Sequence, residues 1–280
     1  MEQFINHNGT ILAADHPVFL YNNRGFCYGD AIFETIRIAN HKPQFLKEHF
    51  QRLFWGISLF KMQMEEQLNQ SFFEDAIIEL AKKNNLNADG RAKLTIYRNQ
   101  GGLYSPENNT ISYLIEISTL LTDGYKLNIK GFNIDLYTEI KKSQNILSSI
   151  KSNNCAIYIM ASIYKKQNLL DECILFNDKG CITEAISSNI FVVKNGVLYT
   201  PEISSGCIEG VMRKKIIDIA RDNHIEVYEL SMLPNVLLEA EELFLTNAIS
   251  GIQWVLAYKQ KKYINTTAIR LIEKLNELIY

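Results

Sequence analysis

Ser148-Ser-Ile-Lys-Ser-Asn-Asn154 carries a lysine, Lys151, and 33 residues after it Glu184 stands in Thr183-Glu-Ala-Ile-Ser-Ser-Asn-Ile-Phe191. A lysine amine is a nucleophile towards carbonyl carbons, and a carboxylate can hold a nearby ring nitrogen protonated. Neither residue is decisive alone, because most lysines are solvated surface charges and Glu184 can equally be an ordinary carboxylate at the end of a strand. The rest of the sequence therefore decides how this pair is interpreted.

Length and composition indicate a globular protein. The chain has 280 residues, enough for a substantial core and about two domains, with 47% apolar and 21% charged residues. A formal net charge of −2, with both signs spread along the sequence, argues against a nucleic-acid surface or a polybasic membrane anchor. The apolar runs are far shorter than the about 20 residues of a membrane span, and the first residues lack a secretion-signal pattern.

The cysteines and histidines predict neither a disulfide framework nor a metal site. Five cysteines are scattered, odd in number and never spaced as Cys-x-x-Cys, which fits a reducing cytoplasm. The five histidines are equally dispersed, without His-x-His or His-Glu-x-x-His, so we expect no bound metal.

The order of apolar patterns predicts a two-domain α+β protein with mixed, mainly antiparallel sheets and flanking helices. Residues 31–38 read as a strand, and apolar residues at helical spacing indicate a helix over 45–60. Ser118–Gly124 is short and polar at its end. We therefore expect a small N-terminal domain over 1–118, a linker over 119–125 and a larger domain over 126–280.

A helix is predicted at 154–166, directly after Lys151, with Ser152 as its candidate N-cap. Further on, Ser204-Ser-Gly-Cys-Ile-Glu-Gly-Val-Met-Arg213 is a glycine-containing loop that runs into another helix. Free backbone N–H groups at a helix start, with the helix dipole behind them, can bind a phosphate. A plain start of a helix explains the same glycines. Together with Lys151 and Glu184, however, such a loop is what a pyridoxal 5′-phosphate enzyme must supply.

Seven segments, in the same order along the chain, resemble the class IV aminotransferase family, the fold-type IV pyridoxal-phosphate enzymes typified by D-amino-acid aminotransferase. This family also contains branched-chain aminotransferases and 4-amino-4-deoxychorismate lyases. The matching segments are Arg24–Arg37, His49–Leu53, Ile150–Asn154, Gly180–Phe191, Tyr199–Pro201, Gly210–Arg213 and Thr246–Ala248.

The resemblance implies roles for individual positions. Lys151 matches the Schiff-base lysine, Glu184 the partner of the pyridine nitrogen, and Arg52 the arginine that grips the cofactor phosphate. Arginine suits phosphate because its planar fork donates two hydrogen bonds, although by periodicity alone Arg52 is a polar-face helix residue. Further cofactor contacts are implied at Ser187, Ser188, Asn189, Val211, Met212 and Ala248.

Two of the family's activities fit the sequence less well. D-amino-acid aminotransferases are similar at Arg98, but their carboxylate-binding tyrosine falls at Phe33 and their histidine at Gln100. Branched-chain aminotransferases typically carry a tyrosine five residues after the lysine, where this chain has Ala156. Their Ser-Gly-Thr block is replaced here by Thr246-Asn-Ala248.

The lyases are more similar at two positions, Thr35 and Asn247. Thr35 can equally be a strand residue chosen for β propensity, and Asn247 a turn-forming asparagine. The resemblance implies conversion of 4-amino-4-deoxychorismate to 4-aminobenzoate and pyruvate, with Lys151 as base and Thr35 as proton relay. Substrate-binding residues are then expected at Asn247, Arg98, Lys93, Tyr28 and Phe33.

Other functions remain open at this point. The alternative activity is a class IV aminotransferase acting on branched-chain L-amino acids or D-amino acids with a 2-keto acid acceptor. A second alternative is a non-catalytic binding protein that keeps the pyridoxal-phosphate fold. The resemblance also implies a homodimer that acts on a small molecule, with neither nucleic acid nor membrane as partner.

Overall fold

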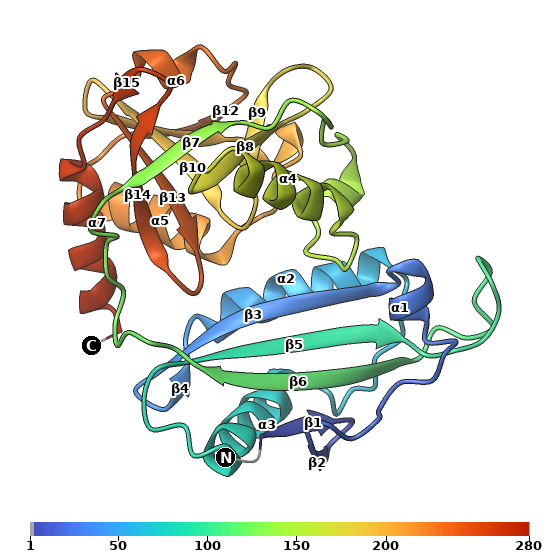
Figure 1. The fold of residues 1–280 in the computed structure, drawn as a ribbon. Helices are drawn as coiled ribbons and strands as arrows, with labels where there is room; N and C mark the ends of the chain where they lie inside the picture. Colours follow the sequence, from blue (N-terminus) through green and yellow to red (C-terminus); the bar gives the residue numbers. More distant parts are fainter. Residues whose placement is uncertain (1–2, 280) are drawn as a thin grey trace. The chain divides into compact units, whose positions relative to one another are not determined.

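The computed structural model describes residues 3–279, and these divide into two compact units (Figure 1). The N-terminal unit comprises the described residues up to Gly124 together with Lys151–Asn154. The C-terminal unit comprises Tyr125–Ile150 and the described residues from Cys155 on. As a statement about domains that fold by themselves, the division into 1–118, 119–125 and 126–280 stays a prediction.

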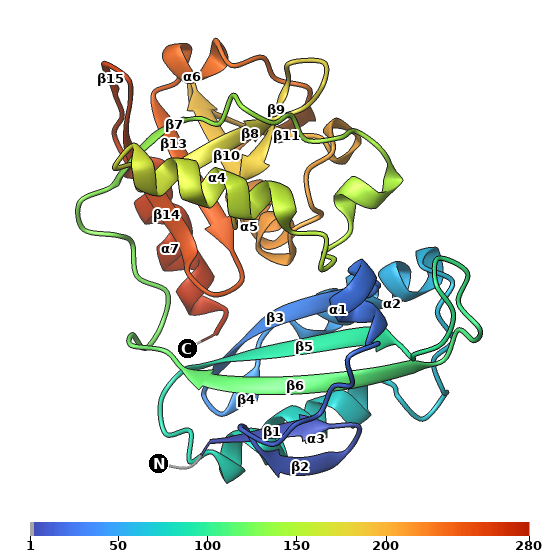
Figure 2. The same ribbon diagram turned by 45° about the vertical axis from the view of Figure 1, so that its right-hand side comes forward.

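The N-terminal unit is a six-stranded antiparallel sheet in the order β2-β1-β6-β5-β3-β4, with α2 and α3 packed against it (Figures 1 and 2). The strand predicted at 31–38 and the helix predicted at 45–60 are confirmed by β3 and α2. The elements are β1 (Phe4–His7), β2 (Thr10–Ala13), α1 (Arg24–Tyr28), β3 (Ala31–Ala39), β4 (Lys42–Pro43), α2 (Leu46–Leu59), α3 (Gln70–Lys83), β5 (Gly90–Arg98) and β6 (Ile111–Thr119).

Strand β3 separates a core face from a second face because successive side chains alternate. Ile32 and Ile36 are buried on the core face, and Glu34 lies between them on that side. Phe33 and Thr35 point to the second face and are only half-buried. Helix α2 contributes Phe50, whose ring lies 5.5 Å from that of Phe73 in α3. This alternation fixes which β3 residues are available to a ligand.

The C-terminal unit is built on a nine-stranded mixed sheet in the order β12-β11-β10-β13-β14-β7-β8-β9, with β15 paired to β14. Most neighbours are antiparallel, and three pairs are parallel. The elements are β7 (Phe132–Leu136), η1 (Ile146–Ser149), α4 (Ala156–Gln167), β8 (Glu172–Phe176), β9 (Ile182–Ala185), β10 (Asn189–Lys194), β11 (Val197–Pro201), η2 (Ile203–Ser205), α5 (Val211–Asp222), β12 (Val227–Leu230), α6 (Val236–Glu239), β13 (Glu242–Asn247), β14 (Gly251–Tyr258), β15 (Lys261–Lys262) and α7 (Thr266–Glu277).

The core of this unit lies among β10, β13 and their neighbours, where Ile190, Val192 and Leu243 are fully buried. Helices α5 and α7 pack together and against β13. Helix α4 packs on β8, and this contact buries Ala161 with Cys173. The strands therefore form a rigid base for the loops that join them.

Two local features differ from the sequence expectations. The helix predicted at 154–166 begins at Ala156, and Cys155 rather than Ser152 is its N-cap. Ser152 instead forms an isolated antiparallel bridge with Ile32 of the N-terminal unit, so its extended backbone is used before the helix can begin. Strand β14, Gly251–Tyr258, was not expected, and it occupies an interior position in the sheet.

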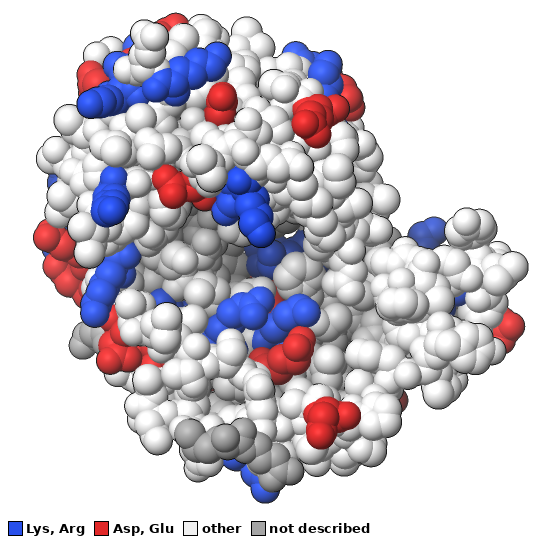
Figure 3. Space-filling view, in the orientation of Figure 1, with Lys and Arg blue, Asp and Glu red and all other residues white. Residues whose placement is uncertain are grey.

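Charged side chains of both signs are spread over the face shown in Figure 3, as the small net charge suggests. Among residues 3–279, no helix combines the length and apolar character needed to cross a membrane. The same residues hold no cluster of three His, Cys, Asp or Glu side chains placed to bind a metal ion. The five cysteines, all of which lie in the described part of the chain, are free thiols.

Candidate active site

The backbone around Lys151 is fixed on β3 in the N-terminal unit. The N–H group of Phe33 donates to the carbonyl oxygen of Lys151 at 2.9 Å. Two residues further on, the N–H group of Asn153 donates to Ala31 at 2.9 Å. These two hydrogen bonds fix the backbone position of Lys151 beside the half-buried face of β3.

Phe33, Thr35, Lys93 and Lys151 gather on that side, and we call them the β3 face. The Lys151 ammonium lies 4.4 Å from the centre of the Phe33 ring, and that of Lys93 lies 5.8 Å from it. Thr35 is directly opposite Lys93 in the β3–β5 pairing, so their side chains share the face. The β3 face thus combines an aromatic ring, a hydroxyl and two amines.

The opposite face of β3 holds a buried ionic group formed by Glu34, His49 and Arg52. Arg52 donates from Nε and Nη2 to the two oxygens of Glu34, at 2.8 and 2.5 Å. His49 Nδ1 lies 2.6 Å from Glu34 Oε2. Burial alone would raise the pKa of Glu34, but Arg52 and His49 bring it down to about 2.

Within this buried ionic group His49 is neutral and Arg52 is bound to Glu34. Burial lowers the pKa of His49, so the ring is neutral and donates from Nδ1 to the carboxylate. Its Nε2 is then an acceptor, and within the described residues it has no hydrogen-bond partner. Arg52, for which phosphate binding is expected, is held by a bidentate contact to Glu34. Its phosphate contact stays a prediction.

In the C-terminal unit, Glu184 on β9 is a buried carboxylate held by three donors. Its Oε1 accepts hydrogen bonds from the Lys142 ammonium and, at 2.7 Å, from the Tyr158 hydroxyl. Its Oε2 accepts one from the N–H group of Ile208 at 2.8 Å. Burial and the charge of Glu184 raise the pKa of Tyr158 well above its ordinary value, so the phenol remains a donor.

The loop that contains Ile208 ends at the N-terminus of α5. The N-cap is Gly210, which has no side chain with which to cap the first N–H groups of the helix. A Cβ atom on Gly210 would lie 1.9 Å from Oδ1 of Asn189, and Asn189 itself donates to the Ile208 carbonyl at 2.8 Å. The backbone of Val211 and Met212 therefore begins the helix at a close approach that requires glycine.

Ser188 and Asn247 lie beside each other, while Ser187 is exposed. Asn247 donates from Nδ2 to Ser188 Oγ at 3.0 Å. Its Oδ1 accepts from the N–H groups of Ile249 and Ser250 at 3.0 and 2.7 Å, so this oxygen shapes a turn. The carbonyl of Ala248 accepts from the Tyr125 hydroxyl at 2.9 Å. Asn247 thus adopts the turn-forming arrangement, and its second amide N–H is the group that it can offer to a ligand.

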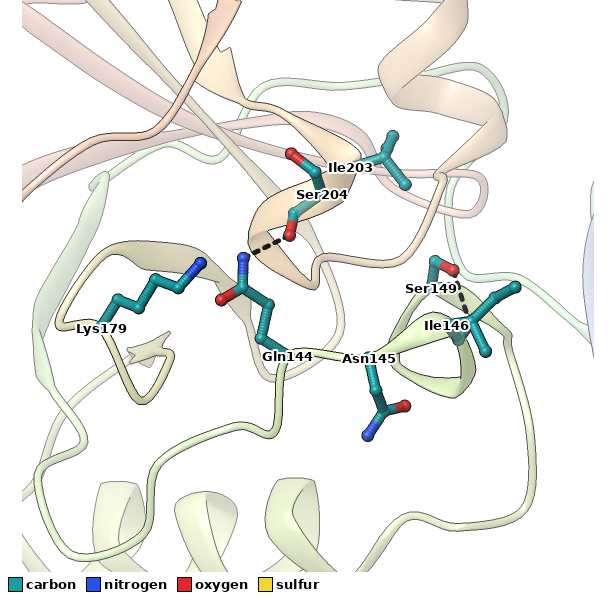
Figure 4. Close-up of a pocket in the computed structure, with 7 residues that line it drawn as sticks. All are labelled: Gln144, Asn145, Ile146, Ser149, Lys179, Ile203 and Ser204. Atoms are coloured by element: carbon teal, nitrogen blue, oxygen red, sulfur yellow. Dashed lines mark hydrogen bonds between the residues drawn. The ribbon is translucent and has the colours of Figure 1, made fainter.

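The C-terminal unit also has an open cavity of about 500 Å³ next to η1 and η2 (Figure 4). Gln144 spans one side of it and donates to the Ser204 carbonyl at 2.6 Å. Lys179 reaches it from the β8–β9 turn, and Ser149 lies at the far end. None of the side chains that line it is one of the sequence-predicted site residues.

Comparison with known proteins decides the family. The family model described as amino-transferase class IV matches residues 31–258. A putative branched-chain-amino-acid aminotransferase of Methanocaldococcus jannaschii is 30% identical over 264 residues, which cover 91% of this chain and 88% of that protein. The chain belongs to the class IV aminotransferase family. It is therefore an enzyme of the pyridoxal-phosphate-dependent type, and its cofactor is pyridoxal 5′-phosphate.

Relatives within the class IV family carry different activities. A D-alanine aminotransferase of Listeria monocytogenes and an aminodeoxychorismate lyase of Bacillus subtilis are 27% and 26% identical to this chain. Each alignment covers 86% of this chain and 82% of the relative. Family membership thus defines the cofactor and leaves room for both transamination and elimination.

Solved structures confirm the fold. The branched-chain aminotransferase of Escherichia coli superposes with a TM-score of 0.88 at 21% identity, over 100% of this chain and 95% of that one. A putative 4-amino-4-deoxychorismate lyase of Legionella pneumophila gives a TM-score of 0.86 at 23% identity, over 94% and 96%. The expected α+β fold of type IV, with mainly antiparallel sheets, is correct.

The residues present fit pyridoxal phosphate. A carboxylate offers about four acceptor positions, and the described residues fill three of those on Glu184, so one on Oε2 is left for a ring N–H. The α5 start, with its glycine N-cap, offers backbone N–H groups to a phosphate. Lys151 supplies an amine. In this family member we therefore propose that these three groups hold the ring nitrogen, phosphate and aldehyde.

Two residues that are predicted to bind the substrate, Arg98 and Tyr28, make other contacts in the structure. Arg98 is buried and donates to Asp30 at 2.8 Å, to the Phe60 carbonyl at 2.7 Å and to the Asn109 side chain. Tyr28 lies on α1 under the Arg24 guanidinium, which is 5.0 Å from the centre of the Tyr28 ring. Their roles in substrate binding stay predictions, and for Arg98 such a role would require this network to open.

Lys142 and Tyr158, the two side chains that hold Glu184, could not be recognised from the sequence. Lys142 falls in the polar run 138–149, where no local pattern separates it from a surface lysine. There is one weak indication for Tyr158 in the sequence. It lies seven residues after Lys151, close to position 156, where branched-chain aminotransferases typically carry a tyrosine and this chain has Ala156. Its contact is with Glu184 at 2.7 Å.

Proposed function

We propose that this class IV enzyme is a lyase that converts 4-amino-4-deoxychorismate to 4-aminobenzoate and pyruvate. The observation that carries this proposal is the β3 face, where the amines of Lys151 and Lys93 lie over the Phe33 ring and Thr35, opposite Lys93 in the sheet, faces the same side. The substrate has two carboxylates and an ether oxygen that must leave. A second amine and a hydroxyl on the same face as Lys151 match those needs.

The chemistry is balanced without any other reactant. When bound, pyridoxal phosphate takes up the electron pair that is left when the substrate loses its C4 proton. Lys151, as an uncharged amine, accepts that proton. The bond between C3 and the ether oxygen breaks, and enolpyruvate leaves as the carbocycle becomes aromatic. Thr35 relays a proton to the departing group, which becomes pyruvate.

The substrate needs anchors for its carboxylates. Lys93 is one third exposed and its contact with Glu116, at 3.3 Å, is a surface ion pair of small strength. It can exchange that partner for a substrate carboxylate at little cost. Asn247 has an amide N–H that can donate to the other carboxylate, which is a donor role and does not disturb its turn.

A transaminase is the second candidate, and the 30% identity to a putative branched-chain aminotransferase favours it. That activity would use the same Lys151 and would require a 2-keto acid to complete each cycle. Of its two forms, the D-amino-acid form is less well supported here, because Arg98 is engaged with Asp30 and Asn109. The third reading, a non-catalytic binding protein, is set aside by membership of an enzyme family.

The deciding experiment supplies the substrate without an amino acceptor. Purified holoenzyme with aminodeoxychorismate alone is expected to form 4-aminobenzoate over many turnovers, with one pyruvate for each. A need for added 2-oxoglutarate or pyruvate, or turnover of L-leucine or D-alanine with 2-oxoglutarate in its place, would contradict the lyase. Lys151→Ala is the control: it should lose the yellow colour that borohydride bleaches in the wild type.

We also propose a homodimer in a reducing cytoplasm. The N-terminal unit exposes an aromatic patch, made of Leu20, Tyr21, Phe26, Leu103 and Tyr104, which are each at least 62% exposed. Arg24 joins its parts by donating to the carbonyls of residues 101–103. In Figure 3 the region around α1 and the loop after β5 is mostly uncharged. Exposed apolar surface of this kind favours a protein partner.

A further inference from the structure

Lys142 is a buried lysine in the segment between β7 and η1 of the C-terminal unit. It is 5% exposed, which is rare for this residue type unless the charge is paired. Its N–H group donates to the Phe176 carbonyl at 2.9 Å, and its backbone forms a parallel bridge with Asn177. The main chain of Lys142 is thus fixed at the end of β8, independently of its side chain.

The ammonium of Lys142 has two acceptors that lie far apart in the sequence. One is Oε1 of Glu184, and the other is the carbonyl oxygen of Ser148, at 3.0 Å. Ser148 belongs to η1 and stands three residues before Lys151 in the chain. One buried cation therefore contacts both the proposed ring-nitrogen acid and the segment that leads to the proposed Schiff-base lysine.

We propose that Lys142 is a positioning residue for the cofactor, which fixes the Glu184 carboxylate and the η1 segment with a single ammonium group. The inference rests on the proposed role of Glu184 and holds equally for elimination and transamination. Tyr158 and Ile208 complete the same task from α4 and from the loop before α5. With three donors in place, Glu184 presents its remaining acceptor position on Oε2 in one direction.

Lys142 also sets the charge around Glu184. Lys142 and Glu184 form an ion pair whose charges cancel. A protonated ring nitrogen bound at Oε2 would therefore share the Glu184 carboxylate with the Lys142 ammonium. Removing the ammonium leaves the cofactor as the one cation on that carboxylate, while the neutral donors Tyr158 and Ile208 remain. Positive charge on the bound cofactor is then favoured, and the pH at which its visible absorption changes is expected to rise. A role confined to packing would leave this midpoint in place.

The test compares Lys142→Met, Lys142→Gln and Lys142→Arg in the full-length protein. Apoprotein is titrated with pyridoxal phosphate to obtain its Kd, and the visible absorption of each holoenzyme is followed against pH. We expect Lys142→Met to raise the Kd at least tenfold and to shift the midpoint upwards. Lys142→Gln keeps a neutral donor and tests the charge if the methionine variant does not fold. Lys142→Arg should keep both values near those of the wild type.

Two controls separate this inference from its premise. Tyr158→Phe removes a neutral donor from the same oxygen, so it should weaken binding without moving the midpoint. Glu184→Gln should disturb both quantities. An unchanged Glu184→Gln variant would show that the proposed cofactor site itself is wrong. Two outcomes would overturn the role of Lys142 alone. One is a Glu184→Gln variant with altered Kd and midpoint while Lys142→Met and Lys142→Gln behave as wild type. The other is an equal loss of affinity in Lys142→Arg and Lys142→Met.

Discussion

Glu34 is an ionised carboxylate inside the N-terminal unit, and its pKa of about 2 lies below the ordinary value of 4.5. A lowered folded-state pKa stabilises the fold fully above pH 4.5, and this contribution is lost as the pH falls towards 2. We expect the unfolding free energy to drop in this window. Glu34→Gln should flatten that drop and cost about 3–5 kcal/mol near neutral pH, because Arg52 loses its carboxylate.

Urea unfolding of the wild type and of Glu34→Gln across this acid range measures both effects. Glu65→Gln is a matched control, since Glu65 is exposed and its loss should leave the profile unchanged. Equal acid slopes in wild type and Glu34→Gln would mean that the Arg52 and His49 contacts do not hold the carboxylate ionised.

Thr35 has two possible roles: it relays a proton during elimination, or it is an ordinary strand residue. Valine has the same branched shape and the same preference for strands, and it lacks the hydroxyl. If Thr35 relays a proton, Thr35→Val should lower kcat by about 10²–10⁴-fold and leave pyridoxal phosphate binding and thermal stability nearly unchanged. Thr95→Val, on the neighbouring strand and facing the same side, is the control. Full activity of Thr35→Val would return Thr35 to the role of a strand former.

At the scale of elements, the start of α5 depends on a close approach rather than on a side chain. Gly210 has an ordinary negative φ of −68°, so alanine is excluded by space and not by backbone strain. The Cβ of Gly210→Ala would collide with Asn189, and the loop or the helix must shift, at about 1–3 kcal/mol. We expect Gly210→Ala to bind pyridoxal phosphate more weakly, which would appear as a higher Kd when the apoprotein is titrated.

The double variant Gly210→Ala/Asn189→Ala tests whether the collision is the cause. It frees the space that the new Cβ needs and should recover part of the stability that Gly210→Ala loses, measured by urea unfolding. If Gly210→Ala binds the cofactor as tightly as wild type, the α5 start is not the phosphate site.

The elements also show what could be predicted from the sequence. Strand β3, helix α2 and the loop before α5 follow from local alternation, helical spacing and glycine placement, all of which lie within one short window. Arg98 and Lys142 do not, because their partners are distant: Asp30 is 68 residues from Arg98, and Glu184 is 42 from Lys142. Only the sheet pairings bring such groups together. The family resemblance located Glu184, but the donors that hold it come from the fold.

At the scale of the whole molecule, the proposed site residues are divided between the two units. Lys151, Thr35 and Arg52 belong to the N-terminal unit, while Glu184 and the α5 start belong to the other. The chain passes between the units before Tyr125 and again on both sides of 151–154. Lys151 is thus bonded through the backbone to the C-terminal unit while its carbonyl is held by β3.

The aromatic patch leads to a prediction about assembly. Phe26 is 83% exposed on α1, a location that water disfavours for so large an apolar ring unless a partner covers it. We expect the wild type to have about twice the chain mass of 32.2 kDa by light scattering after gel filtration. Phe26→Asp should weaken the dimer by about 2 kcal/mol or more, roughly 30-fold in its dissociation constant. Leu169→Asp, at an apolar residue of the C-terminal unit that is still more exposed (92%), should leave the dimer intact. A monomeric wild type, or a dimer that is insensitive to Phe26→Asp, would show that this patch is not the interface.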